Sequence, residues 1–333
     1  MFIVDQPTLA VFFCLITMLC WGSWSNGQKI VTQSAPLQVF YRDYVYGIVL
    51  LSLILAFTLG SIGEEGRPFL EDIQQATLQN LALALAGGIL FNIGNTLLTV
   101  GINLSGIAIA MPVGTGLSMA LGIIVNYIAK PDGDLTLLAI GGGLVLVSIG
   151  MCALAYVARE EDSEEKSDSK GIWVALAGGL VSGFFFLVIT SSIIEELSFP
   201  QKDKLTPYTG LVLFAFGILL SNPLLERILE RLKLTGDDNE TPYKEVPRRE
   251  HLLGLASGLL WCVGMITLLL GSQEAGDAIS YGLSQGATVV SVLWGLFAWK
   301  EFKDAPAKAN RYLWLMGASY VVGLALIIMA RSS

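Results

Sequence analysis

Polar and aromatic side chains recur at helical spacing in three otherwise apolar stretches of the chain. A polar side chain in hydrocarbon costs free energy unless it faces a partner or water. Residues at i, i+3, i+4 and i+7 share one face of a helix. We therefore expect three stripes to face inward and to line a common pocket: Trp21, Trp24 and Gln28; Asn92, Asn95, Thr96 and Thr99; and Tyr281, Ser284, Gln285 and Thr288.

The predicted pocket combines carboxamides with aromatic walls, to which Phe185 and Trp261 are added as apolar candidates. Carboxamides satisfy ring NH, carbonyl and hydroxyl groups, and aromatic faces stack on flat rings or cover the apolar face of a sugar. This chemistry suits a small polar neutral molecule as the substrate. The alternative is that the stripes only hold helices together, because Asn, Gln, Ser and Thr commonly hydrogen-bond between helices in membranes.

Few titratable side chains lie near the apolar stretches. Glu274 and Asp277 flank a short turn, and Asp43 is expected at the start of a helix beside Arg42. These three carboxylates are the candidates for a coupling proton, although the more ordinary interpretation of each is an interfacial or capping charge. The single histidine, His251, is expected to be solvated at the mouth of a helix.

The sequence argues against an enzyme. An intramembrane active site needs a cluster of His, Asp, Glu or Cys side chains that face one another, whereas this chain has one histidine and no acid expected at mid-helix. No metal or other cofactor is expected, because the cysteines lie in apolar runs whose spacing suits neither a zinc site nor a disulfide framework: Cys14, Cys20, Cys152 and Cys262.

The composition is that of a membrane protein. Hydrophobic residues make up 53% of the chain and charged residues only 14%, against about a quarter in soluble domains. The net charge of −8 comes mostly from two acidic loops and implies no nucleic-acid partner. A membrane-spanning helix needs roughly 20 mostly apolar residues. Such runs predict an all-α fold of ten helices: 8–29, 44–62, 80–102, 105–129, 135–157, 171–194, 208–228, 252–273, 276–299 and 311–330.

The segment 88–116 recurs 170 residues downstream. Laid without a gap on 258–286, its glycines Gly88, Gly94, Gly101, Gly106 and Gly116 fall on Gly258, Gly264, Gly271, Gly276 and Gly286. The chain is therefore expected to be a duplication, which is a common build of secondary transporters. We expect one five-helix repeat over 1–158, an acidic linker over 159–170 and a second repeat over 171–333. Five is an odd number, so the second repeat should enter the membrane in the opposite sense.

Proline and glycine occur inside the predicted fourth and ninth helices. Pro112 removes a backbone hydrogen bond beside Gly114 and Gly116, and the matching segment holds Gly282 and Gly286. Interrupted helices at matching places in two repeats point to a midplane binding site. These five residues are the predicted hinges, and close packing of glycine faces is the alternative.

Lys and Arg are more frequent in the loops on the side of the acidic linker than on the side of the termini. The excess of basic residues marks the cytoplasmic side, so both termini are expected to be extracytoplasmic. The N-terminus, MFIVDQPT, lacks the basic region of a signal peptide, and the first helix is expected to stay in the protein.

Four segments carry a resemblance to the drug/metabolite transporter superfamily, and within it to bacterial relatives of the ureide permeases and to the glucose/rhamnose porters. They are CWGSWSNGQK at 20–29, YRDYVYG at 41–47, FNIGNTLL at 91–98 and PVGTGLSMALGIIVNY at 112–127. The resemblance implies ten helices in a five-plus-five arrangement. It also implies proton-driven import of a ureide, nucleobase or sugar across the plasma membrane, the inner membrane of a bacterium.

The partners expected on this basis are the small-molecule substrate, the lipid bilayer and a coupling proton, with the chain acting as a monomer or a homodimer. The linker 159–170 lacks a GxxxxGK[ST] motif, so nucleotide binding is not expected. The rival within transport is an exporter of drugs or metabolites, which the same superfamily also contains. The sequence gives no direction of transport.

Overall fold

The computed structural model describes residues 1–63, 65–105, 107–131, 133–160, 169–196, 201–232, 241–300, 302–303 and 305–332. In these ranges the regular structure is helical, and the only extended pairing is an isolated bridge between Ile193 and Leu205. The helices are α1 (Pro7–Ser23), α2 (Ser25–Val31), α3 (Leu37–Phe57), α4 (Phe69–Gln75), α5 (Leu78–Ser105), α6 (Ile107–Ala129), α7 (Leu135–Glu160), α8 (Ser169–Ser182), α9 (Phe185–Thr190), α10 (Pro207–Leu232), the 3-10 turn η1 (Tyr243–Glu245), α11 (Arg248–Ala275), α12 (Asp277–Ser284), α13 (Ala287–Phe297) and α14 (Ala307–Ser332).

Eight helical stretches among the described residues are long and apolar enough to cross a membrane: 7–31, 37–57, 78–101, 135–158, 170–190, 207–231, 248–275 and 307–330. The described apolar part of α6, Val113–Ala129, is shorter. The chain is thus a multi-pass helical membrane protein, as its composition predicts.

The chain forms two compact units, and neither follows one half of the sequence. Unit 1 contains Met1–Asn92 and Phe185–Ala275, and unit 2 contains Ile93–Phe184 and Gly276–Ser333. The chain passes from one unit to the other between Asn92 and Ile93, inside the continuous helix α5.

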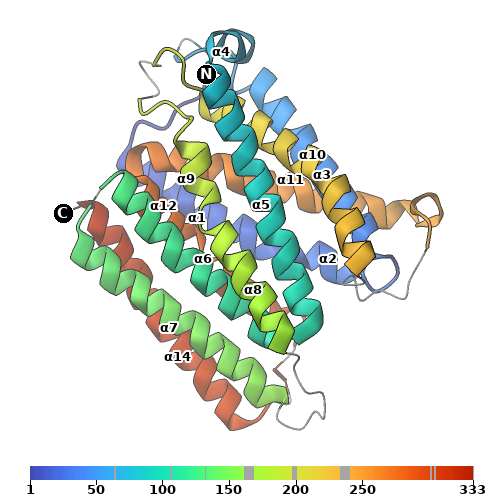
Figure 1. The fold of residues 1–333 in the computed structure, drawn as a ribbon. Coiled ribbons are helices and arrows are strands. Elements are labelled where there is room, and N and C mark those ends of the chain that lie inside the picture. Colours follow the sequence, from blue (N-terminus) through green and yellow to red (C-terminus); the bar gives the residue numbers. More distant parts are fainter. Residues whose placement is uncertain are drawn as a thin grey trace. The chain divides into compact units, whose positions relative to one another are not determined.

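In unit 1, α11 packs against α1 and α3, and α3 also packs against α10 (Figure 1). Glycines let these backbones touch. A Cβ on Gly258 would collide with the carbonyl oxygen of Tyr44, and one on Gly47 would collide with that of Leu255. The same kind of contact joins α5 to α10, where Gly88 lies against the carbonyl of Phe214 and Gly217 against that of Leu85.

In unit 2, α7 lies alongside α14, and α6 packs against α7, α8 and α12 (Figure 1). Gly141 of α7 and Gly323 of α14 each face the carbonyl oxygen of the other, and a Cβ added to either glycine would lie only 2.8 Å from that oxygen. On α6, Gly122 leaves room for the ring of Tyr281, because a Cβ there would overlap that ring. Small residues therefore set the helix spacing in this unit too.

One expected helix start is wrong, and one helix expected as a single span is interrupted. The helix expected from residue 44 begins at Leu37, since Pro36 is extended (φ −60°, ψ 144°) and the apolar residues after it join the helix. Asp43 consequently lies in the second turn of α3 and not at its start. The helix expected over 276–299 is broken into α12 and α13 by a turn at Gln285 and Gly286.

Two other expected helices are each made of two pieces, with α1 and α2 meeting at Trp24 and α8 and α9 separated at Gly183 and Phe184. Of the predicted linker, residues 161–168 lie outside the described part of the chain, as do Gly106 and the side chain of Pro112.

Candidate functional site

Five aromatic side chains of unit 1 form a cluster around Trp261, which we call the aromatic cluster: Trp21, Phe91, Phe185, Phe214 and Trp261. The ring of Trp261 is 3% exposed and stacks on Trp21, with centroids 5.4 Å apart and planes at 9°. It also lies 4.6 Å from Phe91 and, nearly parallel, 6.0 Å from Phe214, while Phe185 meets Phe91 at 5.4 Å. Three of the predicted site residues, Trp21, Phe185 and Trp261, are therefore brought together.

The other two residues of the first predicted stripe, Trp24 and Gln28, lie outside the aromatic cluster. The ring of Trp24 lies 4.9 Å from Tyr44 and 6.4 Å from Phe40. Gln28 is half-buried on α2. The indole nitrogen of Trp21 donates to the carbonyl oxygen of Trp261 (3.2 Å), so its one polar atom is already engaged.

Asn92 is fully buried and joins three helices of unit 1. Its carbonyl oxygen accepts a hydrogen bond from the hydroxyl of Tyr41 on α3 (2.8 Å). Its amide nitrogen donates to Ser221 Oγ (2.9 Å) and to the carbonyl of Ile218 (3.3 Å), both on α10. An amide nitrogen has two N–H donors, so both are used in helix–helix contacts in this conformation.

Two of the predicted site residues of unit 2, Tyr281 and Gln285, lie within α12 and directly after it. Tyr281 is fully buried, and its hydroxyl shares a hydrogen bond of 2.8 Å with Ser118 Oγ on α6. Gln285 follows directly after α12 and is half-buried, with its amide nitrogen 3.5 Å from Ser284 Oγ. Asn95 is half-buried on α5.

The predicted hinge residues also lie in unit 2, where α6 runs as a helix through Pro112. Gly114 faces Leu98 and Ala175, and Gly282 faces Ile123 at 3.3 Å. Gly116 has only distant neighbours, the nearest at 3.7 Å, and Gly286 lies in the turn before α13. Their role as hinges stays a prediction.

Of the three candidate carboxylates, Asp43 has the most distinctive surroundings. Glu274 near the end of α11 and Asp277 at the start of α12 are half-buried. Asp43 is only 4% exposed and accepts hydrogen bonds from the hydroxyl of Tyr243 and at 2.6 Å from the Nδ1 side of His251.

The expectation that His251 is solvated is wrong. Its side chain is 23% exposed, and its second ring nitrogen, Nε2, lies 3.1 Å from the carbonyl of Tyr243. The sequence could not reveal this cluster, because Asp43 and its two partners are some 200 residues apart. The available sequence signal for this cluster was an acidic residue, Asp43, next to an apolar run.

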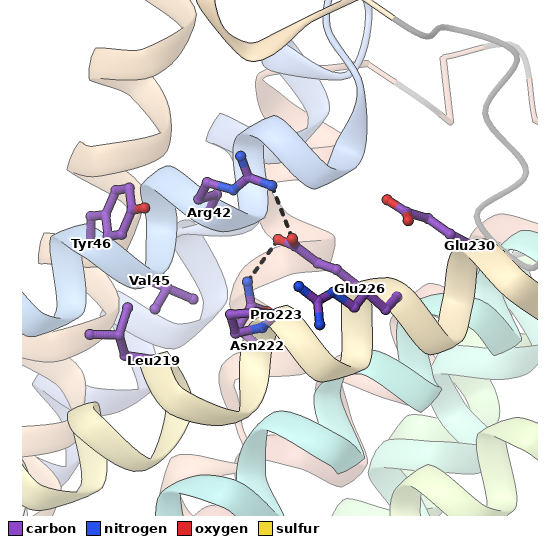
Figure 2. Close-up of a pocket in the computed structure, with 9 residues that line it drawn as sticks. Arg42, Val45, Tyr46, Leu219, Asn222, Pro223, Glu226 and Glu230 are labelled. Carbon is purple, nitrogen blue, oxygen red and sulfur yellow. Dashed lines mark hydrogen bonds and ion pairs between the residues drawn. The ribbon is translucent and has the colours of Figure 1, made fainter.

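A cavity of about 420 Å³ opens between α3 and α10 in unit 1 (Figure 2). Glu226 is its central charge: one carboxylate oxygen binds Arg42 at 3.0 Å and the other accepts from Asn222 at 2.8 Å. The other residues that line the cavity are Val45, Tyr46, Leu219, Pro223, Arg227 and Glu230. This cavity was not predicted from the sequence, although Arg42 and Asn222 are polar residues in apolar helices.

The described residues contain no group of three or more His, Cys, Asp or Glu side chains arranged to hold a metal ion. The polar groups that line the aromatic cluster, the Asp43 cluster and the cavity are amides, hydroxyls, one imidazole and isolated charge pairs. They can hydrogen-bond a ligand or exchange a proton.

Buried polar and aromatic groups inside a multi-pass helical membrane protein are typical of a site for a small molecule. The chain belongs to the Sugar transport protein family, whose model matches residues 12–332. A protein of Enterococcus faecalis named for sugar uptake is 20% identical over 320 residues, covering 94% of this chain and 96% of that protein. Ureide permease 4 of Arabidopsis thaliana is 20% identical over 399 residues, covering 100% and 99% of the two chains.

A solved crystal structure has the same fold, with a TM-score of 0.67 and 15% sequence identity over 98% of this chain and 100% of the other. The similarity to ureide permeases and sugar porters that the motifs indicate is thus confirmed, and these relatives are named as transporters, not enzymes. Membership of the drug/metabolite transporter superfamily stays a prediction.

Proposed function

We propose that the chain is a secondary transporter that imports a small polar neutral metabolite across the inner membrane by alternating access, coupled to protons. A sugar is the first candidate and a ureide or nucleobase the second. The aromatic cluster around Trp261 carries this proposal, because large flat aromatic faces suit the apolar face of a sugar or a flat heterocycle.

The proposed substrate contacts are the residues predicted from the three stripes and the apolar walls. In unit 1 they are Trp21, Trp24, Gln28, Asn92, Phe185 and Trp261, and in unit 2 they are Asn95, Tyr281 and Gln285. Only Trp21, Phe185 and Trp261 belong to the aromatic cluster, which holds no carboxylate.

We also propose a ten-span architecture with inverted repeats, in which α6 and the α12–α13 pair add to the eight long spans. Its support is a set of contacts that recur 170 residues apart. Gly258 meets the carbonyl of Tyr44, and Gly88 meets that of Phe214. Gly47 meets the carbonyl of Leu255, and Gly217 meets that of Leu85. An even number of spans with most Lys and Arg on the linker side gives extracytoplasmic termini.

The first experiment is thermal melting of the purified protein with glucose, rhamnose, allantoin and uracil, since a ligand that binds only the folded state raises the melting temperature. We expect stabilisation by one of the sugars or heterocycles, followed by uptake of that compound into proteoliposomes under an inward proton gradient. Stabilisation by lipophilic cations alone, or efflux without uptake, would favour the exporter.

A further inference from the structure

One end of unit 1 holds a cluster of three polar side chains that the substrate site does not use: Asp43, Tyr243 and His251. Asp43 lies in the second turn of α3, His251 in the first turn of α11, and Tyr243 in η1 just before it. The side chain of Asp43 is 6% exposed and that of His251 is 23% exposed. Buried ionisable groups in apolar helices are costly, so such a cluster points to function.

The hydrogen-bond partners of His251 indicate how many protons the His251–Asp43 pair holds. Nε2 faces the carbonyl of Tyr243 at 3.1 Å, and a carbonyl only accepts, so Nε2 carries a hydrogen. Nδ1 faces Asp43 Oδ2 at 2.6 Å, and this bond needs a proton on one of its two atoms. Whether it is written on the imidazole or on the carboxyl, the pair holds one proton more than a neutral imidazole beside a carboxylate.

Removal of that proton would leave two acceptors facing each other. A bare Nδ1 lone pair and a carboxylate oxygen repel at 2.6 Å, and the low exposure of Asp43 leaves little water to separate them. The proton therefore holds α3 and α11 together at this point, and its loss favours their separation.

A glycine on α11 allows the helices α3 and α11 to come close enough for Asp43 and His251 to pair. A Cβ on Gly254, one turn after His251, would lie 2.7 Å from the Cβ of Asp43 and 3.2 Å from the carbonyl of Phe40. Only glycine permits this approach of α11 to α3.

Tyr243 completes the cluster as a permanent donor. Burial, together with its hydrogen bond to Asp43, raises the pKa of Tyr243 to about 12. Its hydroxyl therefore stays protonated at physiological pH and donates to Asp43 Oδ1. Its ring lies 4.4 Å from the His251 ring and 5.4 Å from the guanidinium carbon of Arg42.

The other charged and titratable groups on the packed elements are largely engaged with other partners. Arg42 pairs with Glu226 of α10 at 3.0 Å, and Glu250 of α11 accepts from Ser34 at 3.3 Å. The same elements also carry Lys29 on α2, Tyr41, Tyr44 and Tyr46 on α3, Lys244 and Glu245 on η1, Arg248, Arg249 and Glu274 on α11, and Tyr208, Arg227, Glu230 and Arg231 on α10. His251 is hydrogen-bonded to Asp43 and to the carbonyl of Tyr243, and the hydroxyl of Tyr243 donates to Asp43.

We propose that Asp43, His251 and Tyr243 bind the coupling proton of transport, and that the structure shows the proton-loaded state. The proton comes from water through the partly exposed His251 and returns to water when the pair separates, with no other bond made or broken. This assignment rests on the proposed function, because it names the site of the proton coupling proposed there.

The decisive experiment uses the fact that His251 is the only histidine in the chain. The full-length protein, purified with a tag free of histidine and labelled with ¹³C-histidine, gives one imidazole signal whose pH titration can be followed by NMR. In Asp43→Asn the pH response of the imidazole signal should differ from that of the wild type, because the ring loses the carboxylate that faces Nδ1 at 2.6 Å.

Tyr243→Phe should also alter this pH response, because the carboxylate loses the hydroxyl that donates to it. Glu195→Gln is the matched control, since it breaks the exposed pair of Glu195 with Lys204 (3.4 Å) far along the chain, and it should leave the titration unchanged. Equal titrations in wild type, Asp43→Asn and Tyr243→Phe would overturn the proposal.

The transport role is tested with ¹⁴C-glucose in proteoliposomes. His251→Gln should retain glucose exchange but lose accumulation driven by a proton gradient, because exchange needs no net proton movement. Gradient-driven accumulation in His251→Gln would overturn the coupling role. If wild type moves no glucose, or moves it without regard to the gradient, the proposed function fails in substrate or coupling, while the NMR titration still decides whether the pair binds a proton.

Discussion

Asn92 has a structural use that its predicted role did not include. The stripe of polar residues on one helix face correctly indicated that its side chain is buried in protein, and the structure shows its amide joining α3, α5 and α10. A substrate would therefore have to compete with Tyr41 and Ser221 for the same amide.

Replacing Asn92 by alanine should lower stability as well as affinity. The Tyr41 hydroxyl would lose its bond to Asn92 and Ser221 Oγ would lose a donor, while Ser221 keeps its own bond to the carbonyl of Gly217; we expect a cost of about 1–3 kcal/mol. Tyr41→Phe, which removes only one bond, should cost about 1 kcal/mol. Thermal melting in detergent measures both, and an unchanged melting temperature in Asn92→Ala would contradict the role as a helix joint.

Trp261→Ala should abolish the ligand-induced rise in melting temperature, because the ring at the centre of the aromatic cluster is lost. The apo protein should also be destabilised, by about 3–5 kcal/mol as for other buried aromatic truncations. Trp314→Ala is the control: this ring is 82% exposed on α14 and should change neither quantity. A ligand shift of normal size in Trp261→Ala would remove the cluster from the binding site.

Residue types and helical spacing predicted which side chains face protein, but not their partners. Trp21, Phe185 and Trp261 were proposed for one site and do meet. The partners of Asp43 come from a segment some 200 residues later, and nothing in local periodicity relates them. Long-range pairing depends on the packing of whole helices, which one sequence does not encode in a readable pattern.

At the scale of helices, glycine spacing determines where backbones cross. Gly258→Ala and Gly88→Ala should each destabilise the protein by about 1–3 kcal/mol, because the added Cβ overlaps a carbonyl oxygen of the facing helix. If the two contacts are related by duplication, the two costs should be similar.

Gly143→Ala is the matched control on α7, where a Cβ would have no neighbour within 4 Å. In a helix interior, alanine is more favourable than glycine by about 0.5–1 kcal/mol, so this variant should be neutral or slightly more stable. Chemical or thermal unfolding of the three variants side by side measures the difference, and equal behaviour of all three would contradict the crossing contacts.

The long apolar runs predicted the helices well and their ends less well. The start of α3 was missed because Asp43 and Arg42 looked like boundary charges, whereas Asp43 is buried beside His251 and Arg42 pairs with Glu226 of α10. The turn at Gln285 and Gly286 lies where the glycines Gly282 and Gly286 predicted an interruption, although the span over 276–299 was expected as a single helix. Hydropathy reports the apolar composition of a segment, and it does not locate the backbone turns that interrupt or end a helix.

The membrane orientation can be checked on the whole molecule by cysteine labelling. Lys202→Cys should react with a membrane-impermeant maleimide in intact cells, and Lys244→Cys only after permeabilisation, since the two exposed residues lie on opposite sides in the proposed topology. The four native cysteines are buried, so the background should be low. The reverse pattern would invert the topology and place the termini in the cytoplasm.

Composition alone was enough to predict a multi-pass helical protein, but not the two compact units. Each unit takes helices from both halves of the sequence, and the division into two sequence repeats stays a prediction. This interleaving arises because α11 packs against α1 and α3, and α14 packs against α7. Such contacts join distant parts of the chain and leave no local trace in the sequence.

The packing of α1 against α11 means that α1 is synthesised long before its partner helix. Pro7–Ser23 enters the membrane first, yet its partner helix is complete only at Ala275. At about 5–20 residues per second, a ribosome needs on the order of ten seconds or more to supply it. During that interval the half-buried face with Trp21 and Trp24 must rest against lipid or a chaperone, so nascent chains stalled before α11 should be the form that quality-control proteases remove.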